Sequence, residues 1–432
     1  PIEKVEYAIL GDGVVETVAA AMLNLHGKKT ALVKCGNQQQ ADRKPYHDAS
    51  EFIKFDVDGT SYRAQFDPLQ RPERCQSLLI NTIFQASLSS YLTLEKCSDP
   101  FILTDQLFKF PVDKQSLLKS QCSLIEKRNL LKFMVSMQNL IMHLAPNYSM
   151  SCQIKESSQV LTALEQDIKE TKPNFKQLLA RFQLEIFIEI CSLTFEIDPE
   201  TPFDNSIKQI ANFFASRARF DDNGSYVVHQ YGWGDVLQCF ERLIYVYNGL
   251  STQEAGILTD TEFESQYIHL KFEKIITFQH SQCKYKHYFV CIREEIKLFN
   301  LDELKNQLVF SKDFKVIIRR GNGQQLSKGL ISFDFYDYTS INECKEWLVK
   351  QQLQILFEKE FIFEREADKE GIEVPAGFGI LQAFMATENL MLQEGIITEK
   401  LFSDGMDIRS QEEALDAFWE KRLNKAPSEQ VE

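Results

Sequence analysis

The sequence lacks the short motifs that identify most hydrolases, kinases and zinc proteins. No two of its ten cysteines are separated by two residues, which excludes zinc-ribbon and thioredoxin spacings. Its seven histidines form no H-E-x-x-H pair, and no G-x-S-x-G elbow, Walker lysine loop or kinase signature is present. His280, Cys283 and His287 could in principle meet, but their segment reads as a strand-flanking loop, so we expect structural or solvated roles for them.

Long apolar runs and an excess of basic charge are also absent. No stretch reaches 18 apolar residues, so we expect no transmembrane helix, and the start does not resemble a secretory signal. The 48 Lys and Arg against 62 Asp and Glu give a net charge of −14. This balance argues against a general nucleic-acid or anionic-membrane binder, although it is compatible with a local basic patch. Scattered cysteines in so long a chain are typical of a reduced, intracellular protein.

The composition is that of a folded protein. With 432 residues, 44% of them hydrophobic, the chain can build a sizeable core in two or three domains. Apolar segments at 7–10 and 30–33 predict two strands around a helix at 14–25 that ends at Gly27. Such a β-α-β unit places both strands in parallel in one sheet.

The later chain alternates between helical and strand patterns. Residues 114–200 are mostly helical and end at a proline-rich break at 198–202, whereas 265–335 are rich in strand patterns. Residues 341–357 read as a helix. A capping box from Ser410 to Glu413 predicts a short amphipathic tail helix. We therefore expect an α/β domain from residues 1–114 and 203–357, an inserted helical domain at 115–202, and a C-terminal extension at 358–432.

Gly11 and Gly13 follow the first strand and open the helix, as in a dinucleotide-binding loop. The third glycine of that fingerprint is replaced by Glu16, whose carboxylate would repel a pyrophosphate. The second strand ends in Lys34 instead of the acidic residue that grips a ribose hydroxyl. We therefore expect a Rossmann-type core that holds no FAD or NAD cofactor.

Two further patterns leave alternatives open. Asp235 stands in the first turn of a predicted helix, and Arg242 follows seven residues later on the same face. Such a pair is either part of a binding surface or a capped helix with a solvated arginine. Met134, Met137 and Met142 in an apolar helix form either a pliable lipid or partner pocket or ordinary core.

The chain resembles the Rab GDP-dissociation inhibitors and Rab escort proteins. Four segments carry the resemblance: 8–16 with 24–29, the hairpin 101–112, E-K-R-N-L-L-K-F at 126–133, and Y-G-W-G-D at 231–235, which continues through Arg242 to 249. It implies a discontinuous domain related to FAD-dependent monooxygenases and an inserted all-helical domain. It also implies a protein that is not an enzyme and that binds GDP-loaded Rab GTPases while shielding their prenyl groups.

The resemblance also assigns candidate residues. The GTPase-binding platform comprises Tyr231, Gly234, Asp235, Gln238 and Arg242. The wall of the prenyl pocket comprises Leu130, Phe133, Met134, Met137, Phe182, Ile186, Phe187 and Ile190. The partner is then a prenylated Rab-type GTPase, in a cytoplasmic protein that is peripheral to membranes.

Departures from the family motivate a second hypothesis. The family's N-P-Y-Y-G-G segment is replaced by Gly-Asn-Gln-Gln-Gln at 36–40, and the last 75 or so residues have no family counterpart. The fold would then serve as a structural subunit of a large assembly, for example in a protist mitochondrion or another organelle. Its partner would bind to Leu415, Phe418 and Trp419 of the tail helix. A flavoenzyme is the third reading, and Glu16 and Lys34 oppose it.

Overall fold

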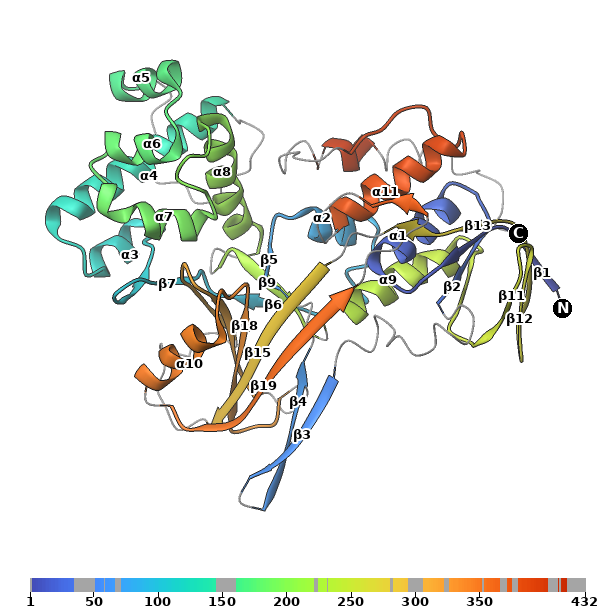
Figure 1. Cartoon of the computed structure of the whole chain (residues 1–432). Coiled ribbons are helices and arrows are strands. Elements are labelled where there is room, and N and C mark those ends of the chain that lie inside the picture. Colours follow the sequence, from blue (N-terminus) through green and yellow to red (C-terminus); the bar gives the residue numbers. More distant parts are fainter. Residues whose placement is uncertain are drawn as a thin grey trace.

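Figure 1 shows the computed structural model of the chain, in which a helical unit and an α/β unit flank a large mixed sheet. The residues described are 2–34, 51–57, 59–66, 71–144, 161–220, 224–230, 232–279, 283–293, 306–321, 326–351, 353–365, 371–374, 380–402, 411 and 413–417.

The predicted β-α-β unit is confirmed. Strand β1 (Ile2–Leu10) pairs in parallel with β2 (Thr30–Val33), and α1 (Val14–Leu25) connects them. The N–H of Gly27 bonds the Asn24 carbonyl at 2.9 Å, and the N–H of Lys28 bonds the Leu23 carbonyl at 3.0 Å. These two bonds form a Schellman motif, and its left-handed position is taken by Gly27 at φ +72°.

This unit is the centre of a six-stranded sheet in the order β10-β2-β1-β13-β12-β11. The additional strands are β10 (Leu250–Thr252), β11 (Gly256–Leu258), β12 (Glu262–Ser265) and β13 (His269–Ile276). One face is covered by α1, α2 (Leu78–Gln85), α9 (Trp233–Val246) and α11 (Ile380–Gln393), which share one hydrophobic core. Every residue of α1 is buried because α9 and α11 both pack against it.

The second sheet is larger and mostly antiparallel, in the order β19-β15-β18-β17-β16-β6-β9-β5, with the predicted hairpin β7–β8 attached to β16. Its strands are β5 (Glu73–Arg74), β6 (Leu94–Cys97), β7 (Phe101–Leu103), β8 (Leu107–Lys109), β9 (Tyr226–His229), β15 (Cys283–Arg293), β16 (Asn306–Phe310), β17 (Lys315–Arg320), β18 (Leu330–Tyr336) and β19 (Ile355–Arg365). Two small ribbons complete the strands: β3 (Glu51–Val57) with β4 (Thr60–Phe66), and β14 (Phe278–Gln279) with β20 (Ile372–Glu373).

Between β8 and β9 the chain forms a helical unit that packs on one face of this sheet. Helix α10 (Ile341–Lys350) packs on the same sheet in a separate hydrophobic cluster. The unit comprises α3 (Lys114–Lys119), α4 (Leu124–Leu144), α5 (Ala163–Thr171), α6 (Phe175–Arg181), the short 3-10 turn η2 (Glu185–Phe187), α7 (Ile188–Phe195) and α8 (Phe203–Arg219). Helix α8 contacts α4, α6 and α7, although the predicted domain boundary separates it from them at residue 202. We therefore describe α8 with the helical unit, and the domain boundaries themselves stay a prediction.

The C-terminal part differs most from the expectation. The helix predicted at 341–357 ends at Lys350, and the chain enters β19 at Ile355, which pairs antiparallel with β15. Helix α11 then packs on α1 in the first core. Residues 355–365 and 380–393, most of which belong to the predicted extension, therefore contribute a strand and a core helix to the fold.

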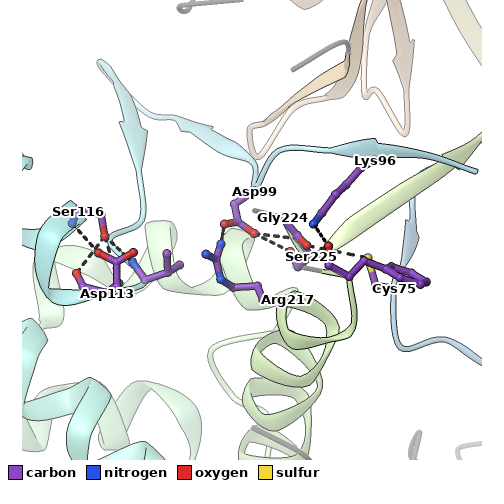
Figure 2. A network of polar contacts seen from close by, with 10 residues as sticks. Cys75, Lys96, Asp99, Asp113, Ser116, Arg217, Gly224 and Ser225 are labelled. Atoms are coloured by element: carbon purple, nitrogen blue, oxygen red, sulfur yellow. Dashed lines mark hydrogen bonds and ion pairs between the residues drawn. The ribbon is translucent and has the colours of Figure 1, made fainter. Parts of the chain in front are cut away.

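A buried polar network joins the helical unit to the large sheet (Figure 2). Arg217 of α8 forms an ion pair with Asp99, which lies between β6 and β7, and both side chains are buried. Asp99 also accepts hydrogen bonds from the backbone N–H of Ser225 at 3.0 Å and from its hydroxyl at 2.9 Å. A side chain at Gly224 would place its Cβ 2.0 Å from the Cys97 carbonyl oxygen, so only glycine fits there. The junction is thus held by a neutralised buried pair and a close backbone approach.

Candidate functional site

The glycine loop between β1 and α1 is filled by a side chain of the chain itself. Gly11 has φ +131°, and a Cβ at this position would stand 2.8 Å from the Cγ atom of Glu16. Glu16 is 2% exposed, so its carboxyl group folds back against the loop. The two remaining glycines keep the tight turn, but the space beside it holds a carboxylate.

The end of β2 carries an ion pair. The ammonium of Lys34 contacts the carboxylate of Glu241 on α9, and the two side chains are 1% and 13% exposed. Glu241 also accepts a hydrogen bond of 3.5 Å from the Ser251 hydroxyl, and the Lys34 N–H bonds the Thr252 carbonyl at 2.9 Å. The position that grips a ribose in dinucleotide-binding proteins therefore ties β2 to α9.

These two sites do not fit a dinucleotide cofactor. A pyrophosphate needs open space at the glycine turn and the positive end of the helix, where Glu16 places a negative carboxylate. A ribose needs an acidic acceptor, where Lys34 supplies a cation already neutralised by Glu241. We therefore derive no flavin or nicotinamide chemistry from this edge of the sheet.

Helix α9 carries the described part of the predicted platform. It begins after Gly232, whose φ of +83° supplies the left-handed entry, and Gly234 and Asp235 form its first turn. Partial burial raises the pKa of Asp235. Gln238 is exposed one turn later, and Arg242 follows at the next turn. Tyr231 lies outside the described residues, so its predicted role stays a prediction.

Arg242 belongs to a patch of aromatic and aliphatic side chains that the sequence reasoning missed. Its guanidinium lies 4.0 Å from the ring centroid of Tyr91, a cation–π contact. Tyr245 and Val246 are more than half exposed, and Tyr91 is 51% exposed. An open pocket of about 450 Å³ is lined by Gln238, Glu241, Arg242, Tyr245 and Val246. The sequence contained one signal for this patch. The polar face of the amphipathic helix carries Tyr245 and Val246 at positions where charged or polar residues are usual.

The predicted prenyl-pocket residues lie close together, with one exception. Seven of them are buried and share one hydrophobic cluster: Leu130, Phe133, Met134, Met137, Phe182, Phe187 and Ile190. The rings of Phe133 and Phe182 meet edge to face at 5.4 Å. Ile186 is 71% exposed, so its assignment to the pocket wall is wrong. It lies in η2, which follows Gln183, and the left-handed conformation of Gln183 changes the helical phase before η2 begins.

The tail prediction is corrected at Leu415. This side chain is fully buried in the core shared by α1, α2 and α11, so it is not available as an anchor for a partner. Its neighbour Asp416 accepts a hydrogen bond of 2.6 Å from the Gln85 side chain of α2. Phe418 and Trp419 lie outside the described residues.

The described residues were also considered as metal ligands and as membrane-spanning helices. Within the described ranges, no three His, Cys, Asp or Glu side chains come together as a metal-binding group. No helix in that part of the chain combines the length and the apolar character needed to cross a bilayer.

Comparison with known proteins places this geometry in context. No protein-family model matches the chain. A guanosine nucleotide diphosphate dissociation inhibitor from Arabidopsis thaliana is 21% identical over 262 residues, which cover 57% of this chain and 55% of that protein. The sequence match thus spans about half the length of that curated relative.

Solved structures extend the likeness to most of the chain. The Rab GDI of Plasmodium falciparum superposes with a TM-score of 0.61 at 13% identity, over 84% of this chain and 90% of that one. Cyclohexylamine oxidase from Brevibacterium oxydans aligns with a TM-score of 0.44 at 13% identity, over 98% of this chain and 100% of that one. The predicted fold class is confirmed: the chain has the mixed α/β, Rossmann-like fold of the FAD/NAD-binding type and is similar to Rab GDP-dissociation inhibitors.

Proposed function

We propose that the protein binds a GDP-loaded, prenylated small GTPase of the Rab class through the exposed face of α9, without catalysing a reaction. The observation that carries the proposal is the pairing of exposed Arg242 and Tyr91 beside the open pocket on α9. Arginine and tyrosine are the residue types in which binding energy concentrates at protein interfaces. The likeness to Rab GDP-dissociation inhibitors in sequence and fold supports the same partner.

The site at the carboxyl end of β1 and β2 supports a binding role over an enzymatic one. In dinucleotide-binding proteins this edge holds the cofactor, whereas here Glu16 and the Lys34–Glu241 pair occupy it. The pair also holds α9 against β2, since Glu241 lies on the same helix as Arg242. A platform that does not deform on binding loses less free energy to ordering.

The helical unit supports a role in shielding the prenyl group. Its core combines flexible methionines at 134 and 137 with the aromatic rings of Phe133, Phe182 and Phe187. Methionine side chains repack around ligands of irregular shape more readily than branched ones do. We therefore propose that a prenyl chain enters between α4, α6 and α7, in a cytoplasmic protein that meets membranes transiently.

The test measures binding of the purified full chain to GDP-loaded Rab, prenylated and unprenylated, by fluorescence titration. We expect micromolar or tighter binding, with the prenylated form bound more tightly. Arg242→Glu should weaken binding at least about tenfold, which corresponds to the loss of one interface hot spot. The control Lys350→Glu makes the same change of charge sign on α10 and should bind as the wild type does.

The proposal fails if the wild-type chain binds no GTPase at micromolar concentration, or if Arg242→Glu binds normally. Native purification separates the scaffold hypothesis from this one. Recovery of the protein in a large assembly without a GTPase would support the scaffold role.

A further inference from the structure

The corner between α3 and α4 exposes an unusual group of aliphatic side chains. Leu118, at the end of α3, is 71% exposed, and Leu124 and Ile125, in the first turn of α4, are 86% and 71% exposed. Single exposed aliphatic residues are ordinary on protein surfaces, but three within eight positions of one corner form a patch.

The corner is held in a fixed conformation that keeps these side chains outward. The Ser123 N–H donates to the Glu126 carboxylate at 2.6 Å, and the Glu126 N–H donates to the Ser123 hydroxyl at 3.3 Å. This reciprocal capping box starts α4. The Lys127 ammonium donates to the Leu118 carbonyl at 2.9 Å, which ties α4 back to the end of α3. The core-facing positions are taken by Leu117 and Leu130, which are buried, whereas the three aliphatic residues of the corner are exposed.

The segment that carries the patch is rich in cations. Residues 113–132 contain Lys114, Lys119, Lys127, Arg128 and Lys132, against only two acidic residues, Asp113 and Glu126. Five positive charges minus two negative charges leave +3 in a chain whose net charge is −14. All of these cations except Lys127 belong to exposed residues. In Figure 1, α3 lies at the outer edge of the helical unit, on the side away from α9.

We propose that the α3–α4 corner is a docking site for the surface of an anionic lipid bilayer. Leu118, Leu124 and Ile125 enter the boundary between headgroups and acyl chains, and the surrounding ammonium and guanidinium groups contact lipid phosphates. The three aliphatic side chains are exposed to solvent at the corner, as shallow insertion into a bilayer requires. The strongly acidic remainder of the molecule is repelled by the same surface. Charge therefore selects this corner and sets the orientation of the bound protein.

This inference goes beyond the proposed function because it requires no GTPase. It is tested by flotation of the purified full chain with vesicles of pure phosphatidylcholine and with vesicles that contain about 30% phosphatidylserine. We expect binding to the anionic vesicles only, and weakening by added salt.

Two sets of variants locate the contact. The triple variant Leu118→Ser, Leu124→Ser, Ile125→Ser should reduce partitioning at least about tenfold. Its control replaces Ile257, Tyr267 and Val349, which are 70–77% exposed elsewhere, with serine and should bind as the wild type does. Lys119→Glu with Arg128→Glu should reduce partitioning at least about twentyfold, since each cation near such a surface contributes about fivefold. The control Lys350→Glu with Lys400→Glu changes the net charge equally.

The proposal is overturned if the wild-type chain fails to float with anionic vesicles, or if the triple variant floats as well as the wild type. It is also overturned if both charge variants bind equally well. A triple variant that loses a protein partner yet keeps its vesicle binding would assign the corner to a protein interface.

Discussion

The Lys34–Glu241 pair allows a sharp test of how α9 is held. Glu241→Gln leaves a buried ammonium whose charge is no longer neutralised by Glu241, in a side chain that is only 1% exposed. Loss of one partner from a buried pair costs about 3–5 kcal/mol. Lys34→Met removes the cation instead and leaves a carboxylate that is 13% exposed and bonded to the Ser251 hydroxyl. Because that carboxylate keeps some solvation, we expect a smaller cost of about 1–3 kcal/mol.

The double variant tests whether the energetic contributions of Lys34 and Glu241 depend on each other. Lys34→Met with Glu241→Gln leaves no buried charge at this position, and we expect it to lie within about 1 kcal/mol of the wild type. The summed costs of the two single variants should therefore exceed the cost of the double variant by about 3 kcal/mol or more. The surface pair Lys28–Glu6, at 2.8 Å with both side chains 35% exposed, serves as the matched control. Glu6→Gln should cost less than about 1 kcal/mol.

The assay is native-state hydrogen exchange at the Lys34 amide, which donates to the Thr252 carbonyl at 2.9 Å and reports opening of the β2–β10 edge. The reasoning is refuted if Glu241→Gln opens this edge no more than Lys34→Met does. Additive single costs in the double variant would refute it equally, because they would mean that the two charges do not depend on each other.

Three further outcomes test other parts of the fold. Burial, together with the positive charge of Arg319, lowers the pKa of His229 to about 4, below its ordinary 6.5. Between these two pH values the unfolded chain therefore binds a proton at His229 that the folded chain does not bind. Stability should therefore fall by about 3 kcal/mol as the pH drops from 6.5 to 4, and unchanged acid unfolding of His229→Gln in urea titrations would contradict this. Arg217→Met leaves the buried carboxylate of Asp99 without its ion-pair partner and should cost about 3–5 kcal/mol by urea unfolding; a cost below about 1 kcal/mol would mean that the network does not hold the junction. Leu415→Ala should destabilise the isolated chain by about 2–5 kcal/mol, since the side chain is fully buried, whereas an unchanged melting temperature would return it to the partner-binding interpretation.

The sequence was most informative where a pattern is local. The β1-α1-β2 unit follows from apolar periodicity and Gly27, all within 33 residues. The mismatch of Glu16 and Lys34 with a dinucleotide site was also readable, because charge at a defined position of a fingerprint has a direct consequence. The sequence did not reveal that Lys34 finds its partner in Glu241, which lies 207 residues later.

The errors arise where tertiary context decides. Strand β19 carries apolar and charged residues in blocks of three and not in alternation, so its assignment depends on pairing with β15, some 70 residues earlier. The exposure of Ile186 depends on a phase change at Gln183 that periodicity alone does not reveal. The sequence predicts that Leu415 lies on the apolar face of an amphipathic helix whether that face packs on the core or binds a partner. Only the position of α2 decides between the two.

The residues at the ends of β1 and β2 bear on the proposed binding role of α9. In a dinucleotide enzyme, the ends of β1 and β2 must stay open to admit the ligand, and the adjoining helix is held partly by that ligand. Here Glu16 fills the turn after β1, and Lys34 at the end of β2 is paired with α9. We therefore expect that the position of α9 does not depend on a bound group and that the proposed binding face, with Arg242 and Tyr245, is formed before any partner binds. If this reasoning is correct, Glu241→Gln should weaken GTPase binding through a slower association step, because only part of the population then presents α9 in its binding position. A faster dissociation rate with unchanged association would instead make Glu241 a direct contact.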